Sequence, residues 1–140
     1  MNKYITVVAI ALIAMFSAFT YNNTRAATPQ QVQPVSYVDK VHRWTDTITH
    51  VNDNIVIAVD NGIPIDSDTI STLLSVRSEI AVTKAPPLYT AFHSHWSHAI
   101  NNLYFAVQAY QRHDLQSMNA FLTLANQEMD NAKHAIPSQL

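Results

Sequence analysis

The chain has 140 residues, a formal net charge of −2 with histidine neutral, and only 13% charged residues. Its eight Lys and Arg residues form no basic stripe, which argues against nucleic acid as a partner. The absence of cysteine excludes disulfides, thiol chemistry and a lipid-modified cysteine. A single glycine, Gly62, is too few for the hairpins and bulges of a sheet-rich domain, so we expect an all-α protein.

The N-terminal segment has one positive charge, at Lys3, and is then uncharged and strongly apolar from residue 4 to residue 21. Two interpretations of residues 1–27 stay open. A signal peptide fits the layout, with Thr24-Arg25-Ala26 as a small-x-small cleavage site. An uncleaved membrane anchor fits the length, at the lower edge of the roughly 17–25 residues that span a bilayer. Both predict an exported protein, periplasmic, extracellular or anchored, with its domain outside the cytoplasm.

Residues 28–34 form a predicted flexible polar linker, and residues 35–140 form one predicted helical domain. If the apolar segment is retained, residues 4–21 contact the membrane and the linker tethers the domain to it.

The first helix is predicted from about residue 35 to residue 61, where Asn61-Gly62 supplies a left-handed cap and Pro64 prevents continuation. Apolar residues recur there at alternating spacings of four and three, the heptad seam of a coiled coil. They are Tyr37, Val41, Trp44, Ile48, Val51, Ile55 and Ala58.

Aspartates recur every seven residues on the opposite side of the same helix, at Asp39, Asp46, Asp53 and Asp60. We interpret this row as a solvated face. A calcium site would need the oxygens gathered around one point, and a heptad spacing separates them instead.

Three further helices follow. A short one is capped by Asp66 or Ser67 and ends near residue 83. Its predicted core face passes through Ile70, Leu73, Leu74 and Ile80, with the stem of Arg77 at the edge. The next runs from about residue 87 to residue 112, with its apolar stripe beginning at Leu88. A tight turn then leads to the last helix, capped by Asp114 and ended by Pro137.

Four amphipathic helices with short connections predict an up-down-up-down four-helix bundle. The second helix is expected to be near 25 Å long and the first near 40 Å, at about 1.5 Å per residue. We therefore expect part of the first helix's seam to be uncovered at one end, as a surface for a partner or a second copy.

A histidine cluster, His93-Ser94-His95-Trp96-Ser97-His98, is the one local feature that could hold a metal. His95 and His98 are three residues apart and share a helix face, which makes half of a zinc or copper site. The other ligands would come from another helix, with Asp46 and His50 or Asp130 and His134 as candidates. Two boundary histidines are the simpler interpretation. A third hypothesis is pH sensing, because histidine titrates near pH 6.5.

No catalytic constellation is evident, and the two glutamates, Glu79 and Glu128, lie on different helices. We expect a non-catalytic interaction or structural module with no resident cofactor, whose partner is a protein or a second copy. Exposed aromatic residues anchor interfaces, and Tyr89 and Phe105 fall off the main stripe of the third helix. These two are the predicted contact residues. Metal binding through His95 and His98 is the alternative function.

Overall fold

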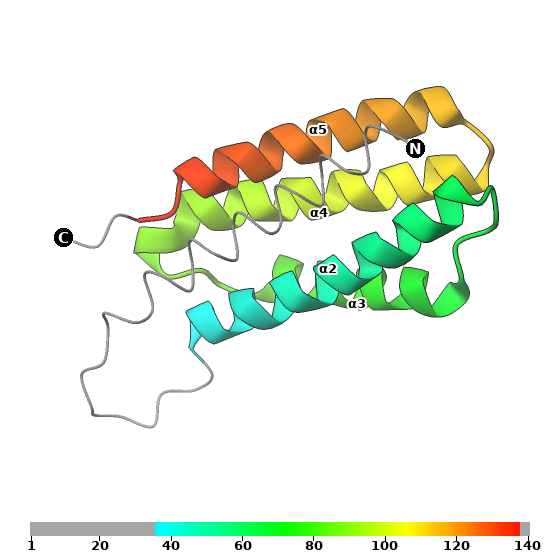
Figure 1. The fold of residues 1–140 in the computed structure, drawn as a ribbon. Helices are drawn as coiled ribbons and strands as arrows, with labels where there is room; N and C mark the ends of the chain where they lie inside the picture. Colours follow the sequence, from blue (N-terminus) through cyan, green and yellow to red (C-terminus); the bar gives the residue numbers. More distant parts are fainter. Residues whose placement is uncertain (1–35, 138–140) are drawn as a thin grey trace.

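The computed structural model describes residues 36–137, and all of the regular structure in that part is helical (Figure 1). Four α-helices follow one another, at Tyr37–Asp60 (α2), Ser67–Val82 (α3), Thr90–Gln111 (α4) and Leu115–His134 (α5). A 3-10 turn, η1, spans Pro87–Tyr89 directly before α4. The prediction of an all-helical bundle domain is therefore confirmed for residues 36–137. The predicted signal or anchor segment and its linker lie outside the described residues.

Consecutive helices run in opposite directions, so the connections gather at the two ends of the bundle (Figure 1). We call the end with the α2–α3 and α4–α5 turns the distal end. The proximal end is the one at which α2 and α4 begin and the α3–α4 connection lies. Because α2 begins there, the N-terminal segment joins the domain at its proximal end.

The core is one continuous cluster of buried side chains to which all four helices contribute. Trp44, Trp96 and Phe92 are the largest fully buried side chains, and each such apolar group contributes about 1.5–3 kcal/mol by burial. The most extensive contact between two helices joins α4 and α5. Small buried residues allow these two helices to approach closely; they are Ala99, Ala106, Ala109, Ala125 and Ala132.

The heptad seam of α2 is buried from Val41 to Ala58, and the aspartate row opposite it is exposed, as predicted. The expectation of an uncovered part of the seam was wrong. At the proximal end, η1 and the first turn of α4 cover the part of the seam that lies beyond the end of α3. The ring of Tyr37 lies 5.2 Å from that of Tyr89 and 6.3 Å from that of Trp44 (centroid distances), and these contacts close the seam.

Side-chain caps begin three of the helices. Ser36 and Asp39 form a reciprocal capping box at the start of α2. Asp66 accepts a hydrogen bond from the backbone N–H of Thr69 at the start of α3, and Asp114 accepts one from Ser117 at the start of α5. Each cap of this kind stabilises its helix by about 1 kcal/mol.

Two details of the predicted core differ from the structure. Leu88 is 70% exposed, because residues 87–89 form a 3-10 turn whose side chains do not follow the α-helical stripe. On α3, Leu73 and Ile80 are buried as predicted, but Val76 is buried with them and Leu74 is only half-buried. Within residues 36–137, no helix has the combination of length and hydropathy that is needed to cross a bilayer.

Candidate functional site

The distal end of α2 is closed by a left-handed turn at Gly62, whose φ is +63°. The N–H of Ile63 donates to the carbonyl of Ala58 (2.9 Å), and the N–H of Gly62 donates to that of Val59 (3.2 Å). This pair of bonds is a Schellman motif. It fixes the direction in which Ile63 and Pro64 leave the helix.

The distal end of α4 repeats the same motif with a residue less suited to it. His113 has a φ of +60°, where a side chain crowds the backbone. The N–H of Asp114 donates to the carbonyl of Ala109, and that of His113 donates to Tyr110, both at 2.9 Å. The turn between α4 and α5 is consequently short and well defined.

Tyr110, on α4, joins these two turns. Its hydroxyl lies 2.9 Å from the carbonyl oxygen of Ile63 and 3.2 Å from that of Ala58, so the two carbonyls share its one proton. Both acceptors lie about 50 residues away in sequence, at separations of 47 and 52. The bond therefore holds the α2–α3 turn against α4.

Between the two turns lies an open, mainly apolar cavity of ≈ 500 Å³, which we call the distal groove. Two of its side chains are large, apolar and half-exposed: Ile63 is 50% and Leu115 is 55% exposed. Its lining residues are Val59, Gly62, Ile63, Pro64, Tyr110, Gln111, His113 and Leu115. A concave surface with exposed apolar groups on a rigid backbone is suited to binding an apolar segment of another chain.

Acidic side chains surround the distal end. Asp60, Asp66, Asp68 and Asp114 are exposed there, and Arg112 is the one Lys or Arg of the two turns. Hydrogen bonds from Thr69 lower the pKa of Asp66, and hydrogen bonds from Ser117 lower the pKa of Asp114. These two carboxylates therefore stay ionised in mildly acidic solution.

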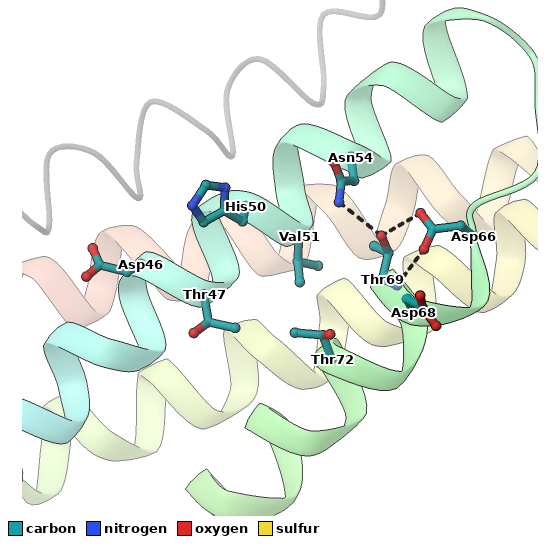
Figure 2. Close-up of a pocket in the computed structure, with 9 residues that line it drawn as sticks. All are labelled: Asp46, Thr47, His50, Val51, Asn54, Asp66, Asp68, Thr69 and Thr72. Atoms are coloured by element: carbon teal, nitrogen blue, oxygen red, sulfur yellow. Dashed lines mark hydrogen bonds between the residues drawn. The ribbon is translucent and has the colours of Figure 1, made fainter.

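A second, polar pocket of ≈ 310 Å³ lies between α2 and α3 (Figure 2). Figure 2 shows how its polar groups satisfy one another: Asn54 and Asp66 both bond to the hydroxyl of Thr69, at 3.1 and 2.6 Å. Asp46 and His50, considered above as metal ligands, also line this pocket, on the outer side of α2. Within residues 36–137, no three His, Asp or Glu side chains are grouped so that they could hold a metal ion.

The predicted metal pair sits at the junction of α4 and α5. Nδ1 of His95 lies 2.6 Å from Oε2 of Glu128, with the two side chains partly exposed. His98 is exposed on the next turn of α4. The structure thus gives His95 a carboxylate neighbour on a different helix, which the sequence alone did not reveal. Zinc or copper binding by His95 and His98 stays a prediction.

His93 has a structural position that sequence reasoning missed. Its Nε2 lies 3.1 Å from the carbonyl of Ile80, which can only accept, so Nε2 must carry the proton. In the neutral ring, Nδ1 then accepts from the hydroxyl of Tyr37 at 3.0 Å. One imidazole therefore bonds α4 to both α2 and α3. Burial lowers the pKa of His93, against a smaller opposing effect of the Ile80 hydrogen bond, and burial raises the pKa of Tyr37 with a contribution from Tyr89.

The predicted contact residues lie in aromatic clusters of the chain itself. Tyr89 is half-buried against Tyr37. Phe105 is 38% exposed, and its ring lies 5.4 Å from that of Phe121 on α5. The guanidinium of Arg77 lies 5.8 Å from the ring of Phe105. Both residues retain some exposed surface, and their role in binding stays a prediction.

In comparisons with known proteins, no family model, no curated protein and no solved structure matches this chain.

Replacing His113 by glycine is expected to stabilise the protein. Glycine adopts positive φ without steric cost, so His113→Gly should raise the free energy of unfolding by about 1 kcal/mol. Chemical denaturation measures this, with His113→Ala as the matched control, which removes the imidazole but keeps the Cβ. A gain of equal size in both variants would show that the backbone conformation is not the cause.

Acidification is expected to destabilise the protein through His93. Its pKa is lowered in the folded state, so the unfolded chain takes up the proton first, near pH 6.5. The free energy of unfolding should therefore be constant above that pH and fall below it, by no more than about 1.4 kcal/mol per pH unit for this one proton. Denaturation between pH 5 and pH 8 tests this. His93→Gln should show a shallower slope, and identical slopes would contradict the assignment.

Proposed function

We propose that the chain is an exported helical-bundle module, without catalytic activity, that binds a protein chain through its distal groove. The observation that carries this proposal is the groove itself. It exposes Ile63 and Leu115 on a backbone that two Schellman turns and Tyr110 hold in place. A preorganised apolar surface loses little conformational entropy when a partner binds.

Export is supported by the uncharged apolar run at residues 4–21 behind Lys3. The proposed module lies outside the cytoplasm whether residues 1–27 are removed or retained. With the tether at the proximal end, the distal groove would face away from the membrane surface. This arrangement suits contact with a partner in the extracytoplasmic space.

A non-catalytic role is supported by the structural contacts of both glutamates and of two aspartates. Glu128 is bonded to His95, and Glu79 forms an ion pair with Arg43 between α3 and α2. Asp66 and Asp114 cap helices. General acid–base catalysis requires a positioned group that is available to a substrate.

Zinc or copper binding is the alternative function, and the His95–Glu128 contact is the observation in its favour. Nε2 of His95 could bind a metal while Nδ1 donates to Glu128, but no group of three candidate ligands forms within residues 36–137, so we prefer the interaction module. Imidazole and carboxylate are both acceptable zinc ligands, but a structural site needs four.

Export is checked by the mass of the protein isolated from the cells that produce it. Either loss of about the first 26 residues or an intact chain in the membrane fraction agrees with the proposal. In both cases, a protease added outside the cytoplasmic membrane should degrade the domain. A chain protected together with cytoplasmic proteins would contradict export.

Partner binding is checked by photo-cross-linking in the same cells. A photoreactive phenylalanine analogue at Leu115 should give a discrete adduct of higher mass. The same analogue at Thr123, exposed on the outer face of α5, is the matched control and should give none. Adducts at both positions, or at neither, would count against the distal groove as a binding site.

A further inference from the structure

The proximal end exposes the two large apolar side chains with the greatest accessibility in the described part of the chain. Val82, the last residue of α3, is 83% exposed, and Leu88, in η1, is 70% exposed. They flank the five-residue connection 83–87. Apolar groups that are this accessible contribute nothing to the core of their own domain, and their burial in a contact would be favourable.

The backbone of this connection is extended at Thr83 and at Pro86. Thr83 has φ −80° and ψ 124°, and Pro86 has φ −58° and ψ 151°, close to polyproline II values. The ring of Pro87 also fixes its φ. A Pro-rich extended segment has little conformational freedom to lose, and grooves that recognise such segments are apolar and lined by aromatic rings. The distal groove is mainly apolar through Ile63 and Leu115, and Tyr110 contributes one aromatic ring to it.

The two ends also differ in charge. The connection carries Lys84, and the sequence has no carboxylate between Glu79 and Asp114. At the other end of the bundle, the distal groove is surrounded by four exposed aspartates against Arg112. Two distal ends placed face to face would bring like charges together, whereas a proximal end placed on a distal end brings Lys84 toward aspartates.

We propose that the distal groove of one copy receives the connection 83–87 of a second copy, together with the flanking Val82 and Leu88. The chains then associate head to tail. This inference rests on the proposed function and names its partner. The connection and the groove lie at opposite ends of the bundle, so one chain cannot satisfy its own groove (Figure 1). The contact is heterologous, and each added copy presents a new free end, which gives open assemblies unless the rotation between copies closes a ring.

The test uses the protein purified in the form that cells produce, with detergent if residues 4–21 are retained. Sedimentation should show a weight-average mass that rises about twofold or more between about 1 and 100 μM, the range expected for a weak contact. Leu88→Glu, at the proximal end, and Leu115→Glu, at the distal end, should each abolish this rise. Leu124→Glu is the matched control, because Leu124 is 46% exposed on α5 away from both ends, and it should behave as the wild type.

Mixing the two blocked variants gives the decisive measurement. The Leu88→Glu chain retains an intact groove, and the Leu115→Glu chain retains an intact connection. An equimolar mixture should therefore form a one-to-one dimer and nothing larger. A two-fold symmetric contact, in which each substitution damages the interface on both chains, would not be restored by mixing. Circular dichroism of each variant confirms that the helices are intact.

A wild-type chain that stays monomeric over this range overturns the head-to-tail proposal, as does a mixture that fails to dimerise or a loss of association in Leu124→Glu. The proposed function can be overturned independently of the head-to-tail proposal. A monomeric chain that still cross-links from position 115 to a different protein leaves the interaction module standing. A monomeric chain with no adduct at position 115 overturns both.

Discussion

Two side chains on α4, the imidazole of His93 and the phenol of Tyr110, hydrogen-bond to the two ends of α2. The closed seam at the proximal end and the groove at the distal end depend on these bonds. At the proximal end, His93 bonds to Tyr37 and to the carbonyl of Ile80. At the distal end, Tyr110 bonds to the carbonyls of Ala58 and Ile63. α4 and α5 pack closely through alanines, whereas α2 is held at a distance that large side chains such as Trp44 fill. The two bonded rings fix the position of α2 along α4.

The order and extent of the helices could be predicted from the sequence because their signals are local. The heptad spacing predicts α2. Asn61-Gly62 predicts its end and Asp114 predicts the start of α5, each within a residue or two of the observed position. The coverage of the α2 seam was not predictable from helix length alone. It depends on η1, where two consecutive prolines and Tyr89 form a 3-10 turn that packs on Tyr37. That same turn exposes Leu88, which an α-helical reading placed in the core.

The candidate site was less predictable, because the contacts that build it join distant parts of the chain. The spacing of Tyr110 fits the apolar stripe of α4, and nothing local indicates that its hydroxyl reaches the α2–α3 turn. The same holds for His93, whose role depends on a carbonyl 13 residues away and on Tyr37, 56 residues away. One local signal was available: Ile63 stands between Gly62 and Pro64, in a turn where an apolar side chain has no helix face to join. That signal is ambiguous, because Ile65, in the same turn, is buried in the core.

The acidic character of the distal end follows partly from the fold itself. Asp66 and Asp114 begin α3 and α5, so antiparallel topology places both capping carboxylates at the same end. These carboxylates stabilise the starts of two helices, so their presence says little about a partner. Asp68 makes no capping bond of its own and stays exposed beside Asp66, so it adds charge beyond what the N-caps provide. The stretch from residue 44 to residue 76 has five aspartates and no Lys or Arg, although α2 and α3 would fold equally well with mixed charges. Of these five, Asp66 is a cap. Asp60 and Asp68 lie at the distal end without beginning a helix, and they are the part of the charge pattern that bears on what that end binds.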